Sequence, residues 1–280
     1  MILSGADEVI QHHIRTRLRN DRRLEFFPSR VVDAGGLYSF QKKIVIGRAS
    51  LFLSNSDPAN QEKLTQDAET AFNNAIKLNP GYNSAYDGLG SVYSGEALRL
   101  LTLVQQNQGD STELDQARAL IDQALAAFQK AASLPPGPRD LAVSAVEAAK
   151  LDIGIALRAR AEIEYRSGDA AATAKTLQEA QDMLAGVVKP FETAKRERYL
   201  AMTHQALGTV WQWRGFLAVT VGDRAAAQQS YTSALDEYQA CLTIGQASVD
   251  RIVREDIVAQ LCQPYYDQVK SLIDNLQKGS

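Results

Sequence analysis

The sequence predicts an all-α fold of about four antiparallel helix pairs, with further helices at both ends and no β-sheet. Apolar residues recur at the helical period along nearly the whole chain, as in Ala68–Tyr93 (AETAFNNAIKLNPGYNSAYDGLGSVY). Glycine-aspartate pairs and prolines interrupt these stretches where one helix has to end and the next to begin. Because a helix pair is too thin to bury its apolar side alone, the pairs have to stack on one another.

The interruptions are of two kinds. Gly109-Asp110, Gly168-Asp169 and Gly222-Asp223 each place a glycine for a left-handed helix end before an aspartate that accepts from the next helix's first N–H groups. Asp110 and Glu113 also have the spacing of a capping box. The second kind contains proline and lies between pairs, at Pro80, at 135–138 and at Pro190.

These signals divide the chain into predicted elements. The four pairs cover about 37–53 and 61–78, 84–108 and 112–134, 140–166 and 170–187, and 192–221 and 224–244. A closing helix covers about 249–276, and Pro264 should kink or break it. We expect residues 1–36 to form an N-terminal helix and a docking segment, and residues 37–280 to form one compact repeat domain.

The segment Ala68–Tyr93 resembles the boundary between two tetratricopeptide (TPR) repeats. The matching positions are Ala68, Phe72, Ala75 and Pro80 in one repeat, and Tyr86, Leu89, Gly90 and Tyr93 in the next. The resemblance implies a right-handed α-α superhelix, a TPR-like solenoid, whose first helices line a concave binding face. It therefore implies a non-catalytic scaffold that binds a protein or peptide.

The repeat length departs from that family. The large residues of the second helices are predicted to be Phe72, Phe128, Leu177 and Tyr231, and subtraction gives steps of 56, 49 and 54 residues. A TPR repeat has about 34 residues. The extra residues have helix-forming patterns, so the sequence predicts unusually long helices rather than long loops.

The resemblance assigns the binding face to exposed polar positions on the first helices. Any of these positions can equally be an ordinary solvated residue. The lysine and asparagine cluster with which some TPR proteins bind a peptide's C-terminal carboxylate is not found at these positions. The candidates are Gln41, Arg48, Ser84, Asp87, Ser91, Ser94, Arg158, Glu162, Tyr165, Gln205, Thr209 and Gln212.

Aromatic residues form two further clusters. Trp211, Trp213 and Phe216 fall within two turns of one predicted helix, so at least one should leave its buried side. Trp211 and Trp213 are therefore possible anchors for a partner, the alternative being that all three rings are enclosed by neighbouring helices. Tyr265 and Tyr266 are expected to bury the last repeat.

No catalytic constellation stands out. The chain has only three histidines and lacks a glycine-rich phosphate loop and a nucleophile elbow. Glu162 and Glu164 lie two apart on a helix and do not share a face, and His204 is expected to be a packed residue. We predict no enzyme activity, cofactor or metal.

Composition favours a soluble cytoplasmic protein, and the abrupt start also suits a piece of a longer chain. Cys241 and Cys262 are expected to be unpaired core residues, and such low cysteine use suits a reducing compartment. A net charge of −3 provides no general attraction for nucleic acid. Two alternatives stay open: self-association, giving a homo-oligomer, and nucleic-acid binding through Arg15, Arg17, Arg19, Arg22 and Arg23.

Overall fold

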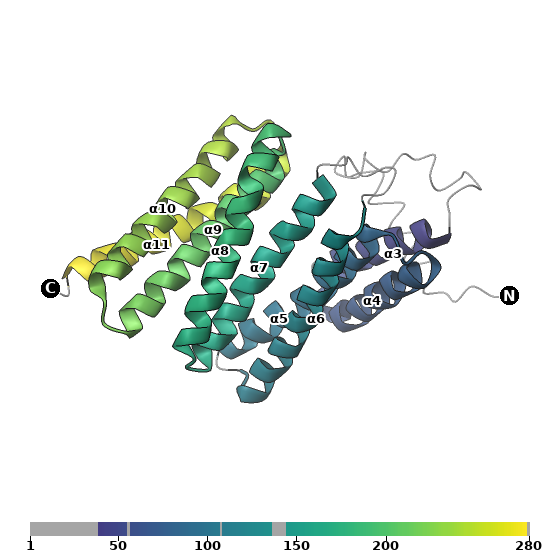
Figure 1. The fold of residues 1–280 in the computed structure, drawn as a ribbon, viewed down its shortest axis with the longest axis horizontal. Helices are drawn as coiled ribbons and strands as arrows, with labels where there is room; N and C mark the ends of the chain where they lie inside the picture. Colours follow the sequence, from purple (N-terminus) through teal and green to yellow (C-terminus); the bar gives the residue numbers. More distant parts are fainter. Residues whose placement is uncertain (1–38, 55–56, 107, 136–143, 279–280) are drawn as a thin grey trace. The chain divides into compact units, whose positions relative to one another are not determined.

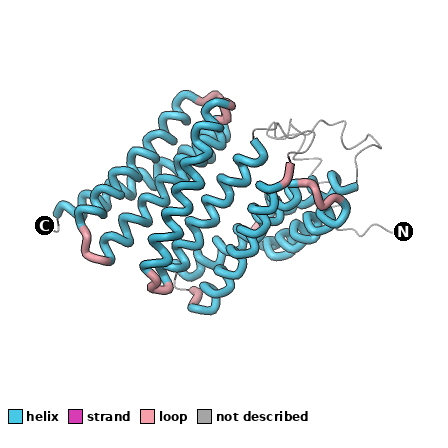
Figure 2. Tube along the Cα trace, in the orientation of Figure 1, coloured by secondary structure: helices cyan, strands magenta, loops and turns pink. Residues whose placement is uncertain are grey.

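The computed structural model describes residues 39–54, 57–106, 108–135 and 144–278. These residues are almost entirely helical, and none of them lies in a β-strand (Figure 2). The predicted all-α class is therefore confirmed for this part of the chain. The predicted N-terminal helix with its arginines, and the docking segment that follows it, lie outside the described residues. In the described ranges, no helix has the length and apolar character that crossing a bilayer requires.

The chain forms two compact units, which meet in the sequence between Pro80 and Gly81. In the first unit, α3 (Ser39–Ser54) packs against α4 (Gln61–Leu78), with one 3-10 turn, η2 (Pro58–Asn60), before α4. That residues 37–280 form a single repeat domain stays a prediction. The second unit contains α5 (Asn83–Gln105), α6 (Ser111–Ser133), α7 (Ser144–Arg166), α8 (Ala170–Thr193), α9 (Glu197–Thr220), α10 (Arg224–Ala247), η3 (Ile252–Cys262) and α11 (Gln263–Lys278).

Within the second unit, helices that follow one another in the chain lie side by side and antiparallel from α5 to α10 (Figure 1). In addition, α7 contacts both α5 and α9, although a second helix lies between them in the sequence. The first helices of the three pairs therefore form a continuous layer. This is an all-α repeat fold, in which each pair covers the apolar side of the next.

A glycine on each first helix makes room for a large side chain of the second helix. A methyl group at these glycines would stand only 2.6 to 2.8 Å from that side chain, so the two helices could not approach as closely. The pairs are Gly47 with Phe72, Gly90 with Phe128, Gly154 with Leu184, and Gly208 with Tyr238.

All four predicted large residues are buried, and Tyr231 packs over another glycine of α9, Gly215. Leu177 and Tyr231 are buried, but the residues that face the equivalent glycines are Leu184 and Tyr238. Subtracting the numbers of the observed residues, beginning with Phe72, gives steps of 56, 56 and 54. The repeat is thus more regular than predicted, and the long helices follow from it.

The turn chemistry is largely as predicted. The capping box is confirmed, since Thr112 N–H donates to Asp110 Oδ1 (2.6 Å) and Asp110 N–H donates to Glu113 Oε2 (2.7 Å). Gly168 and Gly222 both have φ of 79°, the left-handed conformation. The left-handed conformation predicted for Gly109 is wrong, because α5 already ends at Gln105 and the glycine belongs to the loop.

The helix end predicted at Pro190 is also wrong. Helix α8 continues through this proline to Thr193, and the left-handed residue that follows is Lys195, with φ of 53°. Phe191 explains the extra turn, because its ring is buried and stacks on Tyr199 at 5.2 Å between centroids. Burial of such a ring is worth about 1.5–3 kcal/mol, comparable to the roughly 3 kcal/mol that an interior proline costs.

Pro264 does not break the closing helix. A π-helical stretch, η3, passes at Gln263 into α11, so the proline lies in the first turn of α11. Proline lacks the N–H that would bond to the preceding turn, and a π-helical stretch beside it is one way in which a continuous helix accommodates that loss. The type of helix changes at this point, and the chain stays helical.

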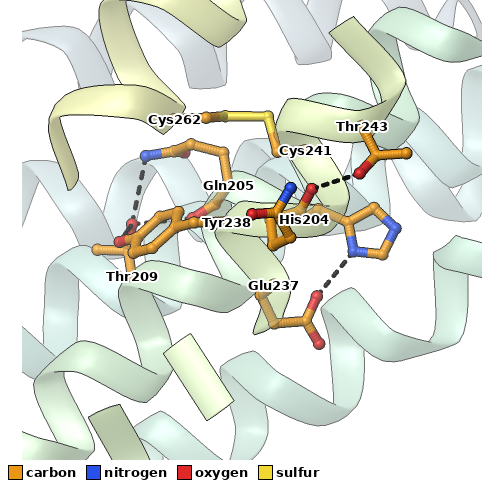
Figure 3. Close-up of a disulfide and its surroundings, with 9 residues drawn as sticks. His204, Gln205, Thr209, Glu237, Tyr238, Cys241, Thr243 and Cys262 are labelled. Atoms are coloured by element: carbon orange, nitrogen blue, oxygen red, sulfur yellow. Dashed lines mark hydrogen bonds and ion pairs between the residues drawn. A yellow bond between two sulfur atoms is a disulfide. The ribbon is translucent and has the colours of Figure 1, made fainter. Parts of the chain in front are cut away.

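The two cysteines are paired. Cys241 of α10 and Cys262 of η3 form a disulfide with a Cα–Cα distance of 6.3 Å, and both are fully buried (Figure 3). The predicted burial is confirmed, and the prediction of unpaired thiols is wrong. Disulfides persist mainly in oxidising compartments, so this bond is evidence against the cytoplasmic location that cysteine use suggested.

Candidate functional site

The candidate residues divide between the two units. Gln41 and Arg48 lie on α3 in the first unit, where Arg48 is exposed and the side chain of Gln41 is outside the described part of the chain. That these two share a surface with the other candidates stays a prediction. The remaining candidates lie on α5, α7 and α9, the first-helix layer of the second unit.

On α5, the serine candidates are less available than expected. Ser84 and Ser94 are buried, and the Ser91 hydroxyl donates to the backbone oxygen of Asp87 on its own helix (3.0 Å). The expectation of exposed serines is wrong at Ser84 and Ser94. Helix α5 contacts both α6 and α7, so less of its surface is free than the sequence pattern indicated.

Asp87 meets a second carboxyl group on α7. Burial, first, and the charge of Asp87, second, raise the pKa of Asp152 well above its usual range, and the two carboxyl groups share a hydrogen bond. Two neighbouring carboxylates cannot both ionise without repulsion, so one proton is held between them. The pair therefore keeps a shared proton to higher pH than an isolated aspartate would.

Asp152→Asn is expected to change how stability depends on pH. Because the folded-state pKa is raised, the folded protein binds more protons than the unfolded chain, and the free energy of unfolding falls as pH rises through that pKa. The neutral asparagine removes this fall, so the variant should be the more stable protein above the raised pKa.

Urea titrations across a range of pH measure this effect. Asp115→Asn, at an exposed position of α6, is the matched control for the change in net charge. Parallel pH profiles for the wild type and Asp152→Asn would contradict the shared proton.

Glu162 is buried, not exposed as predicted. Its side chain is 3% accessible and accepts hydrogen bonds from Arg158 Nη1 (3.0 Å), Arg166 Nη2 (3.0 Å) and Gln105 Nε2 (2.7 Å). Gln105 comes from α5, so this network joins the first helices of two successive pairs. Glu164 points elsewhere, to Arg160 at 3.1 Å, which confirms that the two glutamates lie on different faces.

A small pocket of about 70 Å³ opens beside this network. Arg158 and Ile155 of α7, three residues of α9 and Tyr265 of α11 line it. The α9 residues are Gln205, Ala206 and Thr209. The structure thus brings together three predicted candidates, Arg158, Gln205 and Thr209.

The wall of the pocket is held by Tyr238. Its hydroxyl donates to Gln212 Oε1 (3.1 Å), and its ring stacks on Tyr265. The same hydroxyl lies 3.2 Å from the Thr209 hydroxyl (Figure 3). Gln212 is buried by this contact, so the prediction of an exposed residue there is wrong. Tyr265 does bury the last pair, as expected, and it also closes the pocket.

The aromatic cluster of α9 is half-buried at all three positions. Trp213 makes edge contacts with Tyr165 (5.3 Å) and Phe216 (5.4 Å). Trp211 lies under the guanidinium of Arg214, 5.0 Å from its ring centre. None of the three rings is fully enclosed, so the role of Trp211 and Trp213 as partner anchors stays a prediction.

His204 is a packed residue, as predicted. Its Nδ1 lies 2.7 Å from Glu237 Oε2, so the contact joins α9 to α10 (Figure 3). The ring is largely covered and points away from the pocket residue Gln205, which is its neighbour in the chain.

Sequence reasoning missed four residues of this site. Asp152 and Ile155 precede Arg158 at intervals of three residues, so the same helical stripe extended backwards would have included them. Gln105 lies on the forward extension of the stripe through Asp87 and Ser94. Tyr265 carried no such signal, because only the chain's return over α10 places it at the pocket.

The fold and the polar first-helix layer define an all-α helical repeat protein. No known protein-family model matches the chain, and no curated protein matches it. Among solved structures, the chain is similar to "Crystal Structure of P58(IPK) TPR Domain at 2.5 A", with 16% identity over 86% of this chain and 67% of that chain. The TM-score of that match is 0.16, which is too low to support any argument about function.

Proposed function

We propose that the chain is a TPR-like, non-catalytic scaffold that binds an extended polypeptide along the layer formed by α5, α7 and α9. The pocket lined by Arg158, Gln205, Thr209 and Tyr265 is the observation that carries this proposal. These side chains come from α7, α9 and α11, so one group in the pocket contacts two first helices of the layer and the closing helix. The TPR-like sequence match at Ala68–Tyr93 and the glycine at each helix pair support the same assignment.

The chemistry of the layer suits binding better than catalysis. Glu162 is surrounded by hydrogen-bond donors, and the Asp87 and Asp152 carboxyl groups share a hydrogen bond with each other. These acidic groups are therefore already engaged within the protein. Gln205 and Thr209 are half-buried at the pocket, where Gln205 Nε2 donates to Thr209 Oγ1 (3.3 Å), and amide and hydroxyl groups suit the backbone of an extended peptide.

Selection of peptides from a display library on the immobilised full chain tests this function. We expect peptides whose affinity falls at least tenfold when Gln205 and Thr209 are both changed to alanine, since buried interface anchors cost more than about 1 kcal/mol. Gln239→Ala, at an exposed position of the second helix α10, is the matched control and should bind normally. Peptides that bind the double variant equally well would place the binding surface elsewhere.

Self-association is the second candidate. Val219 and Val221 are exposed at the corner between α9 and α10, beside the hydrogen bond between Tyr165 and Thr220 (2.8 Å). Light scattering separates the two functions, because a scaffold that works as a monomer should have the 30.6 kDa mass of one chain. Nucleic-acid binding through the N-terminal arginines concerns residues outside the described ranges and stays a prediction.

A further inference from the structure

The network around Glu162 contains more positive than negative charge. One carboxylate contacts two guanidinium groups, those of Arg158 and Arg166, whose side chains are only 16% and 27% exposed. The third partner, Gln105, is neutral, so the cluster carries one excess positive charge. A charge that is largely removed from water and not balanced by a partner is costly. An anion bound next to Arg158 would balance it.

Arg158 also has N–H donors that this network does not use. A guanidinium offers several N–H donors in a planar fork, and within the described part of the chain Glu162 is the only hydrogen-bond partner found for Arg158. The same side chain lines the pocket together with Tyr265, whose hydroxyl group can donate as well, whereas the Thr209 hydroxyl already donates to the backbone oxygen of Gln205 (3.0 Å). The unused donors therefore converge on one small space.

The size of that space limits the ligand. A single water needs roughly 10–15 Å³ of such volume, so a pocket of about 70 Å³ admits a small polyatomic group but not a large side chain. Carboxylate and phosphate groups are of this kind, and both accept paired hydrogen bonds from a guanidinium fork.

We infer that the pocket is an oxyanion-binding subsite, in which Arg158 receives a carboxylate or phosphate group on a side chain of the bound polypeptide. This inference rests on the proposed scaffold function and specifies which chemistry the scaffold recognises. Gln205 and Thr209 position the polypeptide, Tyr265 closes the pocket, and Arg158 selects for negative charge.

Titration of the full chain with inorganic phosphate and with acetate, at constant ionic strength, tests the subsite directly. We expect a saturable change in the NMR signal of the Arg158 Nε–H group, and its loss in Arg158→Gln. Arg158→Lys keeps the charge but not the fork, and should bind several-fold more weakly than the wild type. A linear, non-saturating response in the wild type would overturn the inference.

Arg160→Gln is the matched control, because Arg160 lies on the same helix but contacts Asp122 (3.3 Å) and Glu164 instead of the pocket. This variant should bind phosphate and acetate like the wild type. Circular dichroism and the thermal midpoint of each variant show that it is folded. Glu162 retains Arg166 and Gln105 in Arg158→Gln, so we expect that variant to fold.

Peptides from the display selection, acetylated and amidated so that no terminal charge remains, identify the source of the oxyanion. Replacing one acidic residue by its amide should weaken binding to the wild type at least tenfold and leave binding to Arg158→Gln nearly unchanged. A serine at that position tested with and without phosphate distinguishes a carboxylate from a phosphate ligand. If the amide replacement weakened binding to the wild type and to Arg158→Gln by the same factor, the inference would be overturned.

The two proposals fail separately. Peptides that depend on Gln205 and Thr209 but ignore Arg158→Gln would leave the scaffold function intact and remove the oxyanion subsite. Saturable phosphate binding that depends on Arg158, with no peptide selected, would keep the subsite and contradict the scaffold function.

Discussion

Replacing Tyr238 by alanine is expected to lower the free energy of unfolding by about 3–5 kcal/mol, the usual cost of deleting a large buried aromatic side chain. Tyr238 is fully buried, fills the space over Gly208 and stacks on Tyr265 at 5.9 Å between ring centres. Alanine would leave a cavity between α9 and α10 and would remove the support for one wall of the pocket. Urea denaturation followed by tryptophan fluorescence measures the loss, because Trp211 and Trp213 both lie on α9.

Tyr238→Phe separates the hydroxyl group from the ring. It keeps the packing but leaves the buried Gln212 without its donor, a loss of about 1–3 kcal/mol. The phenylalanine variant should therefore be clearly more stable than the alanine variant. Equal stability of the two variants would show that the ring contributes little, against the packing seen over Gly208.

Removal of the disulfide is expected to cost roughly 3 kcal/mol, the value that loop-closure entropy assigns to a crosslink between residues 21 apart. Cys241→Ser with Cys262→Ser breaks the bond between α10 and η3, so the unfolded chain regains conformational freedom. Urea denaturation with and without a phosphine reductant measures the effect. The reductant should destabilise the wild type by a similar amount and leave the double variant unchanged.

The thiol state of the native protein provides the independent check. Alkylation of the native protein after unfolding in urea without reductant, followed by mass spectrometry, should leave Cys241 and Cys262 unmodified because both sulfurs are engaged in the disulfide. Two alkylated cysteines in the native protein would contradict the disulfide and restore the argument for a reducing compartment. An intact bond in protein isolated from its own cells would support an oxidising one.

Several features of this fold could be predicted because they depend on residues close in sequence. The corners at Gly168-Asp169 and Gly222-Asp223 have the predicted glycine conformation, and Asp169 and Asp223 accept from Ala172 and Ala226 N–H (2.9 Å each). Glycine freedom and side-chain capping act within one turn of the chain, so their signals are contained in the local sequence.

The candidate site was predictable only in part. The stripe through Arg158 was identified correctly, but the pattern does not show which of its members a neighbouring helix covers. Glu162 is enclosed by Arg166 and by Gln105 of α5, and Gln212 by Tyr238 of α10. Both were expected to be exposed, because polar residues usually are, and each is buried because another helix supplies its hydrogen-bond partner.

The sequence by itself determined the helices and the ends marked by Gly168-Asp169 and Gly222-Asp223, because the helical period and the capping residues are local properties. Only the tertiary structure decided between Leu177 and Leu184 as the partner of Gly154, since they lie seven residues apart, about two turns, on the same helical face. It also decided that α8 passes through Pro190, that Cys241 meets Cys262, and that Tyr265 closes the pocket. Each of these depends on how far one helix slides along another, and that distance is set by the packing of side chains remote in sequence.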